Sequence, residues 1–386
     1  MVGYLISKNK KECFGCGACF QICPIKAIRM EKDREGFLYP KIDDKKCVTC
    51  NSCHEVCPVE NKVQRQVIKN TFVGYYIDEQ IRKNSSSGGA FKGIVDAAPI
   101  NTLFFGVEWK DRVHAIHSIA VKEEAYLKFS KSKYVQSSTE YTYRETKKVL
   151  DRNGKVVYIG TPCQIAGLKK FLKEDRENLL CIDLICHGVS SSDVLERYCI
   201  ANEKGKNSIV GIDFREKVQK KENIDSKCAV LHYRNGKERI VDYDKSGYLR
   251  GFANGLFFRP SCSVCPFACD KRISDLTIGD AWGIEKEKLN LNPHQGVSLI
   301  LVNNNKGEQW MERVQKVMVL YKVSTQQMVS ENGRLKCPDK GHINRQDFFN
   351  RYVDEDFEKL VQDLIPRISL GRKIGHKIKE MKRRLG

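Results

Sequence analysis

The sequence lacks any apolar run long enough to cross a membrane. The longest candidate, 179–186, is much shorter than the ~20 residues that a spanning helix needs, and it contains Asp183. A secretory leader is also missing, because a cysteine of the first clustered run already stands at position 13. We therefore expect neither a membrane-spanning nor a secreted protein.

Two phosphate-binding signatures are absent as well. The chain contains no Gly-x-Gly-x-x-Gly fingerprint and no Walker loop, so a nucleotide site of either standard kind is not predicted. No nucleic-acid-binding motif occurs, although the formal net charge is +19. We expect no nucleic-acid partner; the basic excess favours an acidic redox partner, an anionic substrate or a membrane surface.

Cysteine, in contrast, is abundant: the chain has 17. Eight of them form two runs of identical spacing, each ending in Cys-Pro: Cys13, Cys16, Cys19 and Cys23, then Cys47, Cys50, Cys53 and Cys57. This doubled spacing is typical of [4Fe–4S] clusters and resembles the bacterial two-cluster ferredoxins. Thiolates free to bind metal also indicate a reducing compartment, so we expect a cytoplasmic protein.

The fourth cysteine of each run is too far along the chain to close on the same cluster, so it ligates the other one. Cluster one is accordingly assigned to Cys13, Cys16, Cys19 and Cys57, and cluster two to Cys47, Cys50, Cys53 and Cys23. The alternative is a pair of structural zinc sites. Zinc prefers two well-separated cysteine pairs, which four cysteines within 11 residues fit poorly.

The secondary-structure pattern divides the chain into several parts. Short strands at 28–31 and 37–40 around a turn predict a hairpin, which completes a ferredoxin-like α+β module over 1–66. Strands are predicted at 71–77, 102–109, 115–121, 156–159, 179–185 and 296–302, with helices at 90–98, 140–151, 165–172, 193–202 and 307–317. The strand–helix alternation after 156 predicts a parallel sheet.

Antiparallel strands with an Asn235-Gly236 turn are predicted over 207–245. We expect a mixed α/β domain with its N-terminal part at 70–149 and its C-terminal part at 150–330, followed by a helical, basic extension at 331–386. The end of that extension, 367–386, carries eight Lys or Arg and one Glu and is amphipathic if helical. It could contact an anionic membrane or a partner, or form a solvated tail.

A third group of cysteines lies far from the first two: Cys163, Cys186, Cys262, Cys265 and Cys269. Cys163 and Cys186 each follow a predicted parallel strand. The carboxyl ends of such strands share one edge of the sheet, where these two residues can face one another. The alternative is that they are buried small hydrophobic residues.

Six ordered blocks carry a family resemblance: SSGGAF at 86–91, SKYVQS at 132–137, GTPCQ at 160–164, CHGV at 186–189, CxxC at 262–265 and IGDxWG at 278–283. Over 70–305 the sequence resembles the beta-subunit family of coenzyme F-420 hydrogenases and dehydrogenases, which also has members with the fused N-terminal module. The resemblance implies a flavin-binding fold that holds FAD beside its own [4Fe–4S] cluster. Its pattern favours Cys163, Cys186, Cys262 and Cys265 as ligands, with Cys269 outside.

The candidate flavin contacts fall in two groups: Ser86, Ser87, Gly88 and Gly89 near the pyrophosphate, and Lys133, Gln136, Thr161 and Gln164 around the ring. Hydroxyls and glycines at a helix start suit an anion, but a serine loop that caps the helix looks the same. Lys133 is either a cation that stabilises reduced flavin or an ordinary surface lysine.

Two residues are candidates for catalysis. His187 follows a proposed cluster ligand and could protonate substrate or flavin, or could bond a backbone carbonyl in its turn. Asp280 could bind substrate or cap the turn in which it lies.

These observations lead to two functional hypotheses. In the first, the protein is an iron–sulfur flavoprotein oxidoreductase: a ferredoxin or other redox protein exchanges electrons with the N-terminal clusters, and FAD exchanges them with a small-molecule two-electron substrate, in either direction. Bacterial members of the family with this fusion occur among genes for surface-polysaccharide synthesis. In the second, the protein is a non-catalytic electron-transfer subunit that docks to a separate enzyme.

Overall fold

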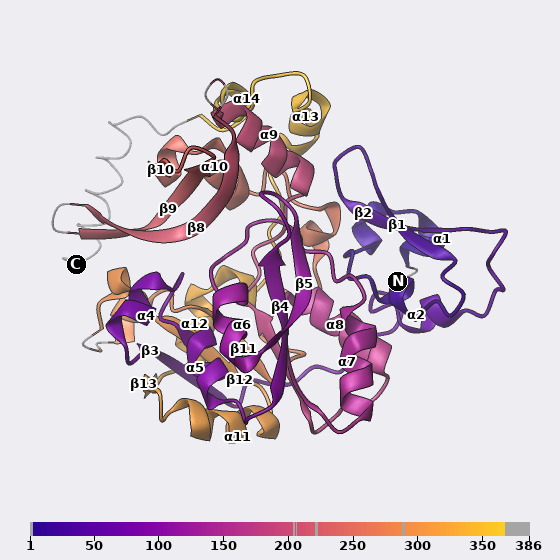
Figure 1. The fold of residues 1–386 in the computed structure, drawn as a ribbon, viewed down its shortest axis with the longest axis horizontal. Coiled ribbons are helices and arrows are strands. Elements are labelled where there is room, and N and C mark those ends of the chain that lie inside the picture. Colours follow the sequence, from indigo (N-terminus) through magenta and orange to yellow (C-terminus); the bar gives the residue numbers. More distant parts are fainter. Residues whose placement is uncertain are drawn as a thin grey trace.

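The computed structural model describes residues 3–366 except 204, 206, 221, 222, 288 and 290. The body of the molecule is an eight-stranded mixed sheet with the order β13-β3-β12-β11-β7-β6-β4-β5 (Figure 1). Its strands are β3 (Asn70–Tyr76), β4 (Thr102–Trp109), β5 (Ala115–Val121), β6 (Lys155–Gly160), β7 (Leu179–Leu184), β11 (Leu276–Asp280), β12 (Ser298–Val302) and β13 (Met318–Lys322). The predicted parts 70–149 and 150–330 therefore share one sheet.

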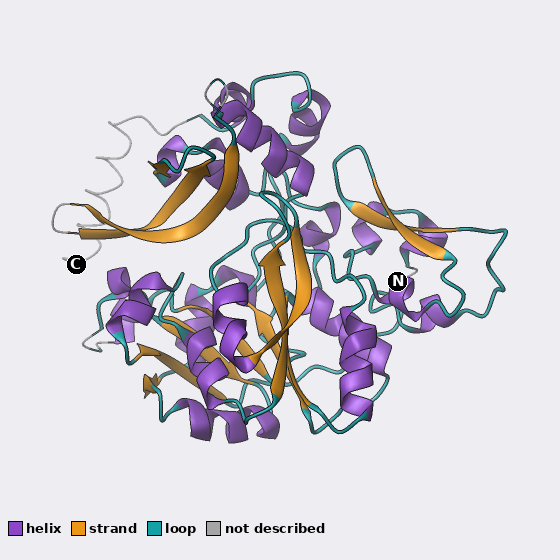
Figure 2. Cartoon of the chain, viewed as in Figure 1, coloured by secondary structure: helices purple, strands orange, loops and turns teal. Residues whose placement is uncertain are grey.

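The centre of this sheet is parallel, as the sequence predicts. Strands β4, β6, β7 and β11 pair in parallel, whereas β5, β12, β3 and β13 add antiparallel strands at the two sides. Helices cover both faces, as Figure 2 shows. Buried strands of this kind have continuous apolar runs, which is why the sequence predicts strands at 156–159 and 179–185.

Successive residues of the central strands enter two different cores. Val156, Tyr158 and Leu179 pack with α7 (Thr142–Asp151) and α8 (Pro162–Leu172). Val157 and Leu180 face the opposite way and pack with α5 (Ala90–Ala97), α6 (Lys122–Phe129) and α11 (Asn305–Val314). The alternation follows from the two-residue period of a strand.

The N-terminal module lies beside α7 and α8 (Figure 1). Its strands β1 (Ile28–Lys32) and β2 (Leu38–Ile42) form the predicted antiparallel hairpin, and its short helices are α1 (Tyr4–Ser7), α2 (Ala18–Ile22) and α3 (Ser52–Glu55). Helix α2 contacts both α7 and α8. The module is therefore packed against the large sheet's helical layer.

A second, smaller body carries a three-stranded antiparallel sheet, β10-β9-β8. It consists of β8 (Ile209–Lys220), β9 (Asn223–Tyr233) and β10 (Glu238–Val241) with α9 (Ser192–Asn202), α10 (Gly247–Ala253), α13 (Arg345–Arg351) and α14 (Phe357–Leu364). The predicted Asn235-Gly236 turn is present, and Gly236 has a φ of +79°. One aromatic-rich core unites these elements.

Several elements are absent from the sequence-based assignment. The sequence pattern shows β11 only as part of a loop motif, because its five residues end in Gly-Asp, and β13 is equally short. Helices α4 (Glu79–Asn84), α6 and α12 (Thr325–Glu331) are not predicted either. The basic amphipathic pattern at 367–386 lies outside the described residues. Within the part that is described, no helix combines the length and apolarity needed to cross a bilayer.

A fully buried ion pair links β7 to the loop that precedes β11. Arg272 donates to Asp183 at 2.9 Å, and the two side chains are 2% and 0% exposed. Removing one member of such a pair leaves an uncompensated charge in the interior.

Replacing Arg272 with Met should therefore lower the free energy of unfolding by about 3–5 kcal/mol. The matched control is Lys147→Met, which breaks the exposed Lys147–Asp151 pair on α7 and should cost less than about 1 kcal/mol. Denaturant unfolding followed by circular dichroism measures both. Equal, small losses in the two variants would contradict the importance of the buried pair.

Candidate functional site

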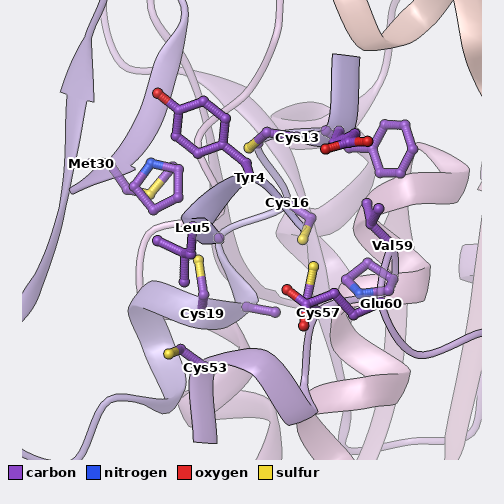
Figure 3. A pocket seen from close by; sticks show the side chains of 17 residues that line it. Tyr4, Leu5, Cys13, Cys16, Cys19, Met30, Cys53, Cys57, Val59 and Glu60 are labelled. Carbon is purple, nitrogen blue, oxygen red and sulfur yellow. The ribbon is translucent and has the colours of Figure 1, made fainter. Parts of the chain in front are cut away.

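Five cysteines from the two N-terminal runs line one small cavity. Four of them are the residues predicted for cluster one, Cys13, Cys16, Cys19 and Cys57, and the fifth is Cys53, which is predicted for cluster two. Figure 3 shows the sulfur atoms of Cys16 and Cys57 directed toward each other although they come from different runs. Gly15 and Gly17 have φ values of +67° and +76°, which turn the chain sharply between these cysteines. The chain thus brings cysteines of both runs together. This is expected if the ligation is crossed, that is, if the fourth cysteine of each run binds the cluster of the other run.

The residues predicted for cluster two lie farther out on the module. Cys23, Cys47 and Cys53 belong to one small cluster of apolar side chains together with Cys19. Cys50 is exposed to solvent. One predicted cluster is therefore enclosed and the other lies near the surface, where an external redox protein could approach.

The enclosed cysteine group sits directly against helix α8. The Tyr143 hydroxyl lies 2.9 Å from the carbonyl oxygen of Cys16 and 2.8 Å from that of Gln164 on α8. Thr139 Oγ1 donates to the same Cys16 carbonyl at 3.0 Å. A Cβ atom at Gly167 would lie 3.0 Å from Cys16 Sγ, so a glycine at this point of the helix permits the close approach.

A large cavity of about 850 Å³ lies at the carboxyl edge of β6, β7 and β11. All three parts of the molecule contribute to its walls: Phe14 from the module, the strand ends of the large sheet, and Phe252 from α10 of the second body. The lining includes most of the sequence-predicted site: Ser86, Ser87, Gly89, Lys133, Gln136, Thr161, Cys163, Gln164, Cys186, His187, Cys262, Cys265 and Asp280. Gly88 is buried behind it, where a Cβ would meet the Gly74 carbonyl at 2.4 Å.

The third cysteine group gathers at one side of this cavity. Cys163 stands in the first turn of α8, Cys186 just beyond β7, and Cys262 and Cys265 in and after a short 3-10 helix (Pro260–Val264). The Cys186 thiol is close enough to the other three to interact with each electrostatically. Burial raises the pKa of the Cys262 and Cys265 thiols to about 12. Such thiols ionise near neutral pH only when a bound metal takes up the charge.

Cys269 points elsewhere. It is not among the described residues that line the cavity, and its thiol donates to the Lys271 carbonyl at 3.3 Å. Arg272 fixes this loop, because its guanidinium donates to the carbonyls of Phe267 and Cys269 while it pairs with Asp183. The placement agrees with the prediction that Cys269 stands outside the third group.

The serine loop before α5 does not cap its helix with its own hydroxyls. Gly89 is the N-cap, and the hydroxyl of Ser298 on β12 accepts from the backbone N–H groups of Gly88 and Ala90. Lys217 on β8 holds the loop from outside by donating to three carbonyls, including those of Ser85 and Ser87 at 2.7 and 2.6 Å. Burial lowers the pKa of Lys217 to about 8.

The four predicted ring contacts have different surroundings. Gln164 forms a capping box with Thr161 and donates to Ser137, so its amide is committed to the fold. Gln136 donates to the Phe14 carbonyl at 2.9 Å and thus joins the cavity to the N-terminal module. Lys133 is only partly exposed, and burial lowers its pKa to about 8.

The two catalytic candidates each pair with a charged residue. His187 Nε2 lies 2.9 Å from Asp339 Oδ2 rather than from a turn carbonyl, and burial holds the pKa of His187 below its usual value. Asp280 accepts from Arg215 Nη1 at 2.8 Å instead of capping its turn. Arg215 has a φ of +63° at an irregularity of β8, a strained conformation that aims its side chain toward the cavity.

Sequence reasoning missed the basic residues of the site: Arg215, Lys217, Arg259 and Arg272. Arg215 and Lys217 belong to β8 and have no local motif around them, whereas Arg259 and Arg272 flank the third cysteine group but bond to the distant Cys13 and Asp183. The only sequence signal is Arg259 itself, which stands directly before the Pro260 that starts the third cysteine loop.

Comparisons with known proteins match two separate segments of the chain. Residues 12–61 match the 4Fe-4S dicluster domain, and residues 153–327 match the C-terminal region of the beta subunit of coenzyme F-420 hydrogenase/dehydrogenase. The resemblance inferred from the sequence is thereby confirmed.

This F-420 hydrogenase/dehydrogenase relative is an iron–sulfur electron-transfer protein whose N-terminal module carries two [4Fe–4S] clusters. Among solved structures it is similar to a chain of the F-420-reducing [NiFe] hydrogenase complex from Methanosarcina barkeri, with 14% identity. The similarity covers 77% of this chain and 92% of that one, with a TM-score of 0.45. No curated protein matches the sequence.

Crossed ligation can be tested with two double variants. Cys13→Ala/Cys57→Ala should remove one cluster, about four iron atoms per chain, because both residues are assigned to cluster one. Cys13→Ala/Cys23→Ala should remove both clusters, about eight iron atoms. Iron analysis of anaerobically purified protein, with each single variant as the reference, measures the difference. The reverse pattern would show that each run binds its own cluster.

Proposed function

We propose that this protein is an FAD- and [4Fe–4S]-dependent oxidoreductase. It passes electrons between the two N-terminal clusters, a third cluster and FAD, and on to or from a small-molecule two-electron partner. The observation that carries the proposal is the single cavity of about 850 Å³, because its walls unite a four-cysteine group with the predicted flavin contacts. Pockets of this size are typical of cofactor sites.

The residues present fit a third cluster. Cys163, Cys186, Cys262 and Cys265 come from three separate segments and meet at one wall of the cavity. The elements that hold them are well anchored: a capped helix start, a strand end, and a loop fixed by the buried Arg272. Four partly buried thiols gathered in this way favour a metal centre over ordinary buried cysteines.

Another part of the lining fits a dinucleotide. Backbone groups of the serine loop and the cation of Arg215 would face its phosphates, and Trp282 offers an aromatic surface nearby. Lys133 carries a positive charge below its pKa of about 8, which would stabilise negative charge on a reduced ring. FAD bound here would exchange single electrons with clusters and electron pairs with an organic substrate.

The position of the module supports an electron path into the cavity. Cys16 abuts α8 close to the turn that carries Cys163, and the two thiols interact electrostatically. Phe14 of the module and Phe267 beside Cys265 are in contact, with ring centroids 5.4 Å apart. Electrons entering at the exposed Cys50 side would therefore cross the enclosed cluster before reaching the third cysteine group.

The end of the cavity near α10 would receive the substrate. His187 and Asp339 form a hydrogen-bonded pair there, and Phe252 and Tyr243 supply apolar surface. His187 is neutral at pH 7 because burial holds its pKa low, so its proton can be held on Nε2 by the Asp339 carboxylate. We assign His187 a proton-holding role there, and Asp280 the role of orienting Arg215 beside the serine loop.

The exposed Cys50 side also suits a second function, that of an electron-transfer subunit docked to a separate enzyme. A ferredoxin or another redox protein is the partner expected for that surface in either case. The same proposal includes a reducing, cytoplasmic setting and a role in polysaccharide synthesis. It also includes peripheral membrane contact through residues 367–386. Substrate turnover by the purified protein alone separates the enzyme from the subunit.

Anaerobically purified protein should contain about 12 iron atoms and one releasable FAD per chain, from three four-iron clusters and one flavin site. Replacing both Cys163 and Cys186 with Ala should lower iron by about four atoms, whereas the matched Cys269→Ala variant should leave it unchanged. Metal, sulfide and flavin analysis measures all three. About eight iron atoms without flavin in the unmodified protein would contradict the third cluster and the flavin site together.

A further inference from the structure

Arg259 is buried between the first cysteine run and the cavity. Its side chain is among the largest that are almost fully enclosed, with 1% of the residue exposed. Nε donates to the Cys13 carbonyl at 2.8 Å, and Nη2 lies 3.4 Å from Cys13 Sγ. The remaining donors reach Leu38 O at 2.9 Å and Gln136 Oε1 at 3.0 Å. One guanidinium thus contacts the sulfur of a predicted cluster-one ligand. It also bonds the backbone carbonyls of Cys13 and Leu38.

Within the described part of the chain, the charge of Arg259 has no acidic partner. No Asp or Glu there forms an ion pair with it, although an unpaired buried charge is costly. The Tyr39 ring lies 4.1 Å from the guanidinium carbon and stabilises the cation only in part. The Cys13 sulfur, 3.4 Å from Nη2, would supply negative charge as a ligand of cluster one.

The surrounding chain is shaped to keep the guanidinium in place. A Cβ atom at Gly15 would lie 2.9 Å from Arg259 Nη1 and 2.7 Å from Gln136 Nε2. Any larger residue at this position would push both side chains off the loop between Cys13 and Cys16. Arg259 also stands three residues before Cys262, so the same loop that carries the third cysteine group positions it.

We propose that Arg259 is a positioning residue that raises the reduction potential of cluster one. Reduction adds negative charge to an iron–sulfur cluster, so a cation and a hydrogen bond at a ligand sulfur favour the reduced state. The cation thus favours uptake of electrons by cluster one, the N-terminal cluster that lies against α8. The inference concerns cluster one alone and does not depend on a third cluster or on FAD.

The test is a potentiometric titration of the full chain, purified without oxygen and followed by electron paramagnetic resonance. Arg259→Gln removes the charge and should shift one N-terminal cluster midpoint to a more negative potential while the other N-terminal midpoint stays in place. Arg259→Lys keeps the charge but loses the planar guanidinium and its several hydrogen-bond donors. It should shift the same midpoint in the same direction by less. Both shifts should persist when Cys163 and Cys186 are replaced, which separates this inference from the proposed function.

The matched control is Arg345→Gln. Arg345 also ties the module to the rest of the chain, through Glu35 at 3.2 and 2.5 Å, but among the described residues none of its hydrogen bonds reaches a cysteine sulfur. Its loss loosens the same interface and should leave both N-terminal midpoints unchanged. Unchanged potentials in Arg259→Gln, or an equal shift in Arg345→Gln, would overturn the proposal. If Arg259→Gln fails to retain iron, an unchanged midpoint in iron-replete Arg259→Lys would overturn it instead.

Discussion

The constraint on which this structure depends is the cost of burying negatively charged sulfur. A thiolate is stable inside a protein only beside metal or another positive charge, so residues that gather several thiols must also provide for their charge. The enclosed cysteines meet this requirement through iron in the N-terminal module and through Arg259 beside Cys13. Helix α8, the module and the third cysteine loop are packed together around that arrangement.

We propose that the fold places one-electron and two-electron chemistry within reach of each other. Parallel strands β6, β7 and β11 end at a common edge, and the residues at or just beyond their ends include Cys163, Cys186 and Asp280. The N-terminal module closes one side of that edge, and the body built on β8, β9 and α10 closes another. Our proposed oxidoreductase follows from this convergence, since neither the module nor the sheet alone forms the cavity.

Much of this was predictable because the decisive signals are local. The cysteine spacing fixes the cluster type, and the apolar runs before Cys163 and Cys186 predict strands that end beside them. Arg259, Lys217 and Arg215 were not predictable, because each acts on residues that only the tertiary fold brings near. The serine loop was open to two interpretations for the same reason: Ser298, which comes more than two hundred residues later, supplies the hydroxyl that the helix start needs. Asp280 has the sequence context of a turn residue, and only the bulged strand β8 places Arg215 against it.

The central claim is that one chain holds a connected set of one-electron centres and a two-electron carrier. The most direct measurement is an anaerobic reductive titration of the purified protein, followed by its visible spectrum, to count electrons taken up per chain. The account predicts about five equivalents, one for each of three clusters and two for FAD. Uptake of about two equivalents would leave only the N-terminal clusters and contradict it.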